Sequence, residues 1–95
     1  MRMSNVTVAY APDKERYEIK LGDEMVGYAT ARRRGGVVTM PHVEITPAHR
    51  GKDMASRLVR GALEDVRTRG ERVVALCPFV VAFLRRNPGF RDLVA

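Results

Sequence analysis

The chain has few of the side chains that cross-link small folds or hold metal ions. It has one cysteine, Cys77, which excludes an intramolecular disulfide and a four-cysteine zinc site. It has only two histidines, His42 and His49, so no metal site is predicted. No apolar run approaches the roughly 20 residues that span a bilayer, and no signal-peptide-like stretch follows the first residues. These absences predict a cytoplasmic protein without a membrane span.

Positive charge, in contrast, is abundant. The 95 residues carry a net charge of +6, with a sequence pI near 10.2. Such a balance favours acidic partners: nucleic acid, an anionic membrane or a polyphosphate ligand. Most arginines are scattered, as on a solvated surface, and Arg32, Arg33 and Arg34 form the densest run. The length and the 45% hydrophobic content predict one globular domain over residues 1–95, as a monomer or weak dimer.

Alternation of polar and apolar side chains indicates several strands. The predicted strands are 6–10, 15–21, 25–31, 37–45 and 72–77. Tight turns are expected at Gly22 and at Gly35, each followed by a second turn residue. Pro41 lies inside the fourth strand and predicts an edge position or a bulge there, because proline cannot donate to a sheet ladder.

Two helices are predicted in the second half of the chain. Apolar residues at helical spacing form one stripe over 52–69, and Gly70 suits the position just after the helix end. Pro78 suits the first turn of a second helix over 79–86, and a short turn over 90–94 follows. A helix between two strands implies a crossover and a parallel pair. The predicted class is α+β, with one layer of mixed, mostly antiparallel sheet and two main helices packed on it.

The segment between Ile45 and the long helix is the most informative part of the chain. A strand ends there, a basic turn containing Arg50, Gly51 and Lys52 follows, and a helix begins. The free N–H groups of a helix N-terminus and a close-approaching glycine turn together form a site for a phosphate. The alternative is an ordinary strand-to-helix connection with two solvated basic residues.

Two stretches of the chain resemble the GNAT superfamily of N-acetyltransferases. The first is His42-Val43-Glu44-Ile45 followed by Arg50-Gly51-Lys52-Asp53-Met54-Ala55-Ser56-Arg57-Leu58, which looks like the acyl-CoA-binding core. The second, Ala75-Leu76-Cys77-Pro78-Phe79-Val80 with Phe83-Leu84-Arg85-Arg86-Asn87-Pro88, looks like the end of the short, stand-alone GNAT-like proteins. The resemblance covers about residues 15–94. It implies a mixed sheet whose strands splay apart to form a cleft for acetyl-CoA.

The resemblance also implies which residues touch the cosubstrate. Main-chain groups of the strand near Ile45 face the pantetheine arm, the turn holds the pyrophosphate, and the last helix forms a groove wall. The implied binding residues are Val43, Ile45, Arg50, Gly51, Lys52, Asp53, Met54, Ala55, Phe83 and Arg86. For Phe83, with Phe79, the alternative is a core aromatic, and for Arg86 a solvated side chain. One departure stands out: the family turn usually reads Arg-Gly-x-Gly-x-Ala, and Asp53 replaces the second glycine. Its carboxylate either repels the phosphates or complements the helix dipole.

Two residues are candidates for chemistry. Cys77 precedes a helix start, where the dipole favours a thiolate, and the resemblance places it near the acetyl thioester, so that an acetyl-cysteine intermediate is conceivable. Glu44 matches a strand glutamate that larger GNAT enzymes use as general base. The alternatives are a small buried hydrophobe and an exposed carboxylate. His42 is predicted to be structural and His49 to lie in the loop.

The sequence as a whole thus predicts an acetyl-CoA-binding protein that moves acetyl to an unidentified amine. The alternative is a non-catalytic module that binds CoA, or that binds nucleic acid or an acidic protein through its arginines. The scattered charge and the lack of a helix-turn-helix or aromatic stacking motif disfavour nucleic acid.

Overall fold

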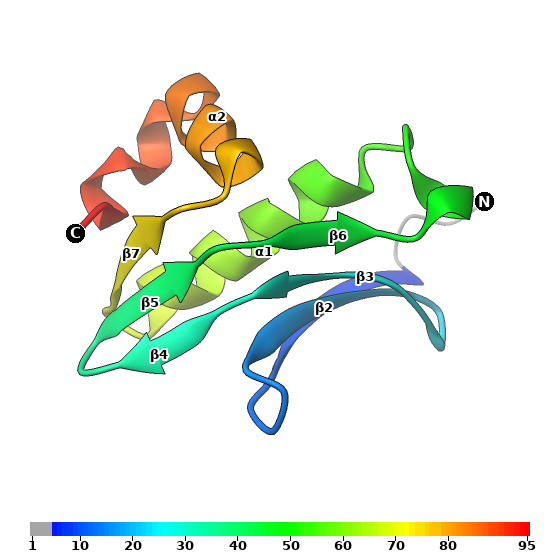
Figure 1. The fold of residues 1–95 in the computed structure, drawn as a ribbon, viewed down its shortest axis with the longest axis horizontal. Helices are drawn as coiled ribbons and strands as arrows, with labels where there is room; N and C mark the ends of the chain where they lie inside the picture. Colours follow the sequence, from blue (N-terminus) through cyan, green and yellow to red (C-terminus); the bar gives the residue numbers. More distant parts are fainter. Residues whose placement is uncertain (1–4) are drawn as a thin grey trace.

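The structure, a computed structural model, describes residues 5–95 (Figure 1). Seven strands and two α-helices follow one another along the chain, with short 3₁₀ segments between and after them. The strands are β1 (Val6–Ala11), β2 (Arg16–Leu21), β3 (Glu24–Thr30), β4 (Arg32–Arg34), β5 (Val37–Met40), β6 (Val43–Ile45) and β7 (Arg72–Ala75). The helices are α1 (Met54–Thr68) and α2 (Pro78–Arg86), and the 3₁₀ segments are η2 (Pro47–His49) and η3 (Pro88–Leu93).

The strands form two hydrogen-bonded sheets rather than the single layer that the sequence predicts. The first is antiparallel, with the order β1-β2-β3-β6. The second has the order β4-β5-β7, in which β4 and β5 are antiparallel and β5 and β7 parallel. The parallel pair confirms the crossover that the strand–helix–strand order predicts. The mixed α+β class with two main helices is also confirmed.

Two links between strands, one at Ala31 and one at residues 41–42, carry the chain from one sheet to the other, and the second lies inside a strand that the sequence predicts as continuous. The predicted strand 37–45 divides into β5 and β6 at Pro41 and His42. The predicted strand 25–31 ends at Thr30, and the three arginines after Ala31 form β4, which the sequence analysis did not predict. Proline lacks the N–H that a continuing ladder needs, and this explains the break at Pro41.

Local features of the backbone explain where the two helices begin and where α1 ends. The first helix starts at Met54 instead of residue 52, because Asp53 has a left-handed backbone with φ of +65°. Gly70, with φ of +70°, follows the helix as expected. Strand β7 ends at Ala75, two residues before the predicted end. The N–H groups of Leu76 and Cys77 both donate to the carbonyl of Met40, at 3.1 Å each, and α2 begins immediately afterwards.

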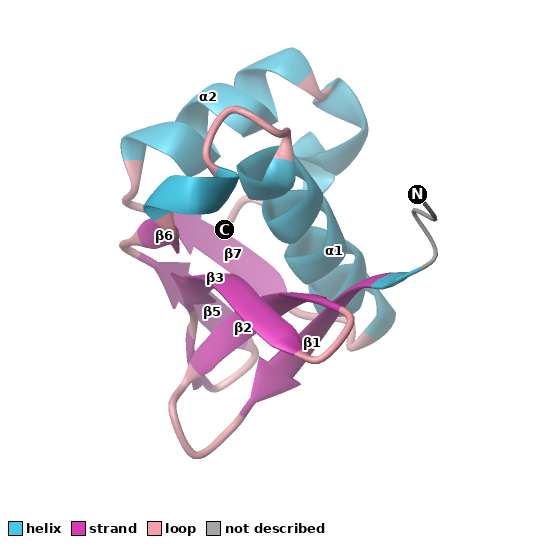
Figure 2. Ribbon diagram, turned by 90° about the vertical axis from the view of Figure 1, so that its right-hand side faces the viewer, coloured by secondary structure: helices cyan, strands magenta, loops and turns pink. Residues whose placement is uncertain are grey.

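The helices lie on one side of the strands, and the core is enclosed between them (Figure 2). The apolar stripe of α1 is fully buried against the sheets, and α2 adds Val80, Phe83 and Leu84. Helix α1 passes close to β1 at Gly61, where a Cβ would lie only 2.8 Å from the Cβ of Val8. The opposite face of the strands carries no helix among the described residues.

Candidate functional site

A pocket of about 230 Å³ lies where β6, the following turn and the start of α1 meet α2. Its lining residues come from all of these segments: Ile45, His49, Arg50, Gly51, Asp53, Met54, Ala55, Ser56 and Phe79. Six of the ten binding residues implied by the sequence resemblance line it, namely Ile45, Arg50, Gly51, Asp53, Met54 and Ala55. The fold therefore gathers most of the sequence-predicted turn around one hollow.

The start of α1 supplies free N–H groups to this pocket. The first helical hydrogen bond is from the Arg57 N–H to the Asp53 carbonyl, at 3.1 Å. The N–H groups of Met54, Ala55 and Ser56 precede it and have no helical partner. No side chain caps this end, and its first turn holds no acidic residue. The helix dipole and these donors together favour an anion.

The turn before α1 is held by its own polar contacts. The Arg50 Nε donates to the carbonyl of Ile45 at 3.0 Å, and the Thr46 hydroxyl lies 3.0 Å from Nδ1 of His49. Gly51 has φ of +78°, and no heavy atom lies within 4 Å of where its Cβ would be. The backbone therefore follows a glycine-favoring path beside open space, as a cradle for a bulky anion requires.

Asp53 lies in this turn without closing it. It is exposed, and its carboxylate makes no hydrogen bond to the free N–H groups of α1. Its positive φ explains why glycine is common at this place in the family turn, since aspartate is one of the few other residues that tolerate the left-handed region. Asp53 therefore does not cap the helix, and whether its carboxylate repels the phosphates or complements the helix dipole stays a prediction.

The free edge of β6 faces away from β3. The Thr30 N–H donates to the His42 carbonyl and the Thr46 N–H to the Val26 carbonyl, both at 2.9 Å. Hydrogen-bonding residues alternate along an antiparallel strand. The N–H and carbonyl of Glu44 therefore point toward β3, and those of Val43 and Ile45 point toward the free edge. The Ile45 carbonyl is already used by Arg50, which the sequence did not predict.

The side chain of Glu44 lies on the solvent face of β6. Its Oε1 is 2.9 Å from Nε2 of His42, and the two side chains are 49% and 52% exposed. The ring of Tyr28, on the neighbouring strand, lies 5.9 Å from the imidazole. Alternation along the strand thus places Glu44 beside His42, as expected, but on the face opposite to Ile45, which lines the pocket.

Cys77 lies at the junction of β7 and α2. It is the residue before Pro78, the first residue of α2, and its carbonyl accepts the N–H of Val81 at 3.0 Å. The residue is only 7% exposed. Burial is what the structural alternative predicts, while the position at a helix start is what the reactive-thiol hypothesis requires.

The aromatic residues of α2 divide into a pocket residue and a core residue. Phe79 lines the pocket, whereas Phe83 is 2% exposed and packs against Phe90, with ring centroids 6.0 Å apart. The expectation that Phe83 forms a groove wall is therefore wrong. The helix turns it inward, and Phe79, one turn earlier, takes that place. Arg86 is exposed at the end of α2 and outside the pocket lining, and its predicted phosphate contact stays a prediction.

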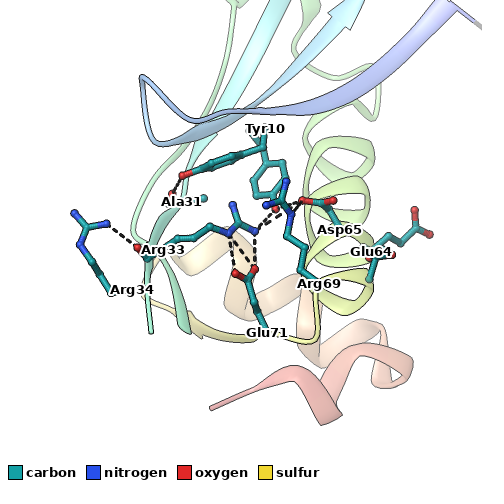
Figure 3. Close-up of polar contacts among 10 residues, drawn as sticks. Tyr10, Ala31, Arg33, Arg34, Glu64, Asp65, Arg69 and Glu71 are labelled. Carbon is teal, nitrogen blue, oxygen red and sulfur yellow. Dashed lines mark hydrogen bonds and ion pairs between the residues drawn. The ribbon is translucent and has the colours of Figure 1, made fainter. Parts of the chain in front are cut away.

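A polar cluster joins the second sheet to the far end of α1 (Figure 3). The Arg33 guanidinium is paired with Glu71, with Nη2 2.7 Å from Oε1, and donates from Nη2 to the Tyr17 hydroxyl at 2.7 Å. That hydroxyl donates to Asp65 Oδ2 at 2.6 Å. The guanidinium carbon lies 4.3 Å from the centre of the Tyr10 ring, a cation–π distance. The cluster is structural, and it removes Arg33 from the surface available to a partner.

The cluster also acts on the Tyr17 hydroxyl. Burial raises the pKa of Tyr17 well above its usual value, and the bond to Asp65 raises it further, against the opposing effect of Arg33. The phenol therefore stays neutral and donates to the carboxylate. The sequence did not predict this cluster. Along β4 the side chains alternate, so that Arg32 and Arg34 are exposed and Arg33 is half-buried, and a run of three identical residues does not show which of them turns inward.

Within residues 5–95, no three His, Cys, Asp or Glu side chains gather as a metal site would require. Neither helix of this part of the chain has the length and apolar character of a membrane span.

Comparisons with known proteins fit this fold and turn. Residues 16–93 match the family described as GCN5-related N-acetyl-transferase. A GCN5-like protein from Staphylococcus aureus, solved in solution, superposes with a TM-score of 0.69 at 16% identity over 98% of this chain and 91% of that one. The Escherichia coli ribosomal-protein-S18-alanine N-acetyltransferase superposes with a TM-score of 0.64 at 9% identity, over 90% of this chain and 53% of that one. No curated protein matches the sequence significantly.

The fold is thus that of a small α+β protein of the N-acetyltransferase type, with a glycine-containing turn before its long helix. The chain belongs to the GCN5-related N-acetyltransferase (GNAT) family.

Proposed function

We propose that the protein binds acetyl-CoA in the pocket at the start of α1 and transfers the acetyl group to an amine. Family membership supports acetyl-CoA as the cosubstrate. The observation that carries the proposal is the uncapped N-terminus of α1, with the free N–H groups of Met54, Ala55 and Ser56 beside the open Gly51 turn. These groups suit a pyrophosphate because they offer several donors and a positive dipole end without a competing carboxylate bond.

Other residues would hold the rest of the cosubstrate. The free main-chain groups of Val43 and the Ile45 N–H suit the amides of the pantetheine arm, and Phe79 provides an apolar wall. The Lys52 ammonium and the exposed guanidinium of Arg86 add positive charge for phosphates. Bound acetyl-CoA supplies an activated acetyl thioester.

The chain's own part in the transfer is to handle the amine's proton. Glu44 is the proposed general base, and His42, 2.9 Å away, orients its carboxylate. The amine nitrogen bonds to the acetyl carbonyl carbon, the carbon–sulfur bond breaks, and the amine's proton goes to Glu44. CoA leaves as a thiolate that takes a proton from solvent water, and Glu44 returns its proton to solvent.

Calorimetry tests the proposal against the nucleic-acid alternative. We expect micromolar binding of acetyl-CoA at low and moderate salt, and no steeply salt-dependent binding of a random DNA duplex. The structural reason is that Arg33 is occupied in the polar cluster and leaves only two exposed arginines on β4. Duplex binding without acetyl-CoA binding would contradict the proposal.

A second route, through Cys77, makes a separate prediction. If the Cys77 thiolate accepts the acetyl group before the amine does, intact mass measured after incubation with acetyl-CoA shows one added acetyl group, labile to hydroxylamine. The Cys77→Ala variant should lose this adduct completely while still binding acetyl-CoA, because Cys77 lies outside the pocket lining. An adduct that persists in the variant excludes Cys77, and the direct route through Glu44 then stands alone.

A further inference from the structure

A second pocket lies on the other side of β7, away from the turn. It has a volume of about 340 Å³ and lies between β7, α2, η3 and the two residues that follow η3. Its lining is largely aliphatic, with two arginines at the rim: Val73, Val74, Ala75, Val81, Leu84, Arg85, Arg91, Val94 and Ala95. None of these residues belongs to the proposed acetyl-CoA site.

The strand beside this pocket has an edge that is only partly covered, because Val94 bridges to it at Val73. The N–H groups of Arg72 and Leu76 donate to carbonyls at either end of β5. The main-chain groups of the residues between them therefore point alternately away from β5 and toward it. The main-chain groups of Val73 point away from β5, and its carbonyl accepts the N–H of Ala95 at 2.9 Å. The main-chain groups of Ala75 also point away from β5, and among residues 5–95 no strand pairs with them there. One main-chain donor and one acceptor therefore remain for an added strand.

Two exposed apolar side chains of the described residues lie near the two ends of β7. Leu76 is 62% exposed and Val94 43%, and they are the two exposed large hydrophobic residues of the described chain. Val94 lines the pocket, and Leu76 follows β7 directly. Exposed apolar groups beside a free strand edge are typical of a surface that binds an extended segment.

The free charge around the edge is positive. Of the four arginines on β4 and β7, Arg33 is paired with Glu71 and Arg34 with Glu15, and Arg32 and Arg72 form no ion pair within residues 5–95. The sheet register places Arg34 and Arg72 in one row with Val37 on the outer face, and Arg85 and Arg91 stand at the pocket rim. The nearest acidic residue of η3, Asp92, is paired with Arg67 of α1. The surface thus complements an acidic occupant.

We propose that the edge of β7 and the pocket beside it, together the β7 edge groove, dock an extended, acidic segment of a protein that carries the acceptor amine. An aliphatic side chain of the segment enters the pocket, its main chain pairs with Ala75, and its carboxylates meet Arg72 and Arg85. The strand leads through Leu76 directly to Cys77 at the start of α2. The groove therefore guides a peptide toward Cys77, which accepts the acetyl group in the second route, and this part of the inference rests on that form of the proposed function.

Two other occupants fit the groove less well. Nucleic acid would use the arginines but gain nothing from an aliphatic pocket, and the groove has no aromatic side chain for a base to stack on. A second copy of the chain, paired edge to edge, would bring Arg72, Arg85 and Arg91 near the same residues of its partner.

The test uses fluorescein-labelled peptides and anisotropy. The probe alternates leucine or valine with glutamate and ends in a lysine. Its matched control has glutamine at each glutamate. We expect the acidic peptide to bind at least tenfold more tightly than the neutral one at low salt. The Arg72→Glu/Arg85→Glu variant should weaken its binding by about tenfold, since both arginines are exposed and their charge is reversed.

The matched control variant is Lys14→Glu/Lys20→Glu, which makes the same change of charge on the first sheet and its hairpin. It should bind the peptide nearly as well as the parent protein. The inference would be overturned if the acidic and neutral peptides bound equally well, or if the two variants weakened binding equally. It would also be overturned if a DNA duplex bound more tightly than the peptide, or if the protein self-associated and the arginine variant did not. Acetyl-CoA titration of the same proteins separates the two proposals. If acetyl-CoA binds and the peptide does not, the inference fails and the proposed function stands.

Discussion

A Gly51→Val variant is expected to lose most of its affinity for acetyl-CoA, with Kd rising by about 100-fold, or about 2.7 kcal/mol. The space around the Gly51 Cβ position is empty within the protein, so a valine would not clash with the fold. It would instead extend its methyl groups where the pyrophosphate approaches the main chain. A β-branched residue also resists the positive φ of this position, and this would pull the turn away from the first N–H groups of α1.

The matched control for this variant is Gly22→Val. Gly22 also has a positive φ, +64°, and open space around its Cβ position, but it lies in the β2–β3 hairpin and not in the pocket lining. Both variants should lose a similar amount of stability, about 1–2 kcal/mol from the strained backbone. Calorimetry with acetyl-CoA should then show a large loss for Gly51→Val and little for Gly22→Val. Unchanged affinity in the Gly51 variant would contradict the assignment of the turn.

An Arg33→Ala variant should show the largest loss of stability, about 2–4 kcal/mol. Its side chain is 15% exposed and that of Glu71 16%, so removing the guanidinium leaves a largely desolvated carboxylate without its partner. The Tyr17 hydroxyl also loses its donor, and the ring of Tyr10 loses the cation above it. A urea unfolding curve with an unchanged slope and a lower midpoint measures the effect.

Arg34→Ala provides the comparison for this prediction within the same strand. Arg34 is paired with Glu15 at 3.2 Å, but the two side chains are 74% and 42% exposed. Solvent screens such a pair, and its loss should cost no more than about 0.5 kcal/mol. Equal effects of the two substitutions would show that the cluster around Arg33 contributes little to the stability of the fold.

The sequence predicted the elements whose signals are local. The stripe over α1, the turn at Gly22 and the alternation over β2 are confirmed because each depends on neighbours within a few residues. The division of the strand at Pro41 depends on which partner each half meets. That information lies in β3 and β7, far along the chain, and so only the possibility of a bulge could be predicted.

The same distinction applies to the functional residues. The turn at Arg50 and Gly51 was predicted to be a phosphate site because a glycine and a helix start are visible in the sequence. The exchange of Phe79 for Phe83 at the pocket was not predicted, since both residues fit an apolar helix face equally well. The polar cluster of Arg33 was not predicted either, because its partners Tyr17, Asp65 and Glu71 come from β2, from α1 and from the link between α1 and β7.

The parallel pairing of β5 with β7 has a consequence for how the chain folds. Strands β1, β2 and β3 are joined by short turns and can pair soon after they collapse. The register of Val37 with Arg72, in contrast, encloses β6 and the whole of α1, so that a long loop must close before the second sheet is complete. The hairpin strands are therefore expected to acquire amide-exchange protection in the earliest refolding phase. Strand β7, and with it Cys77 and the start of α2, should be protected only after α1 has docked.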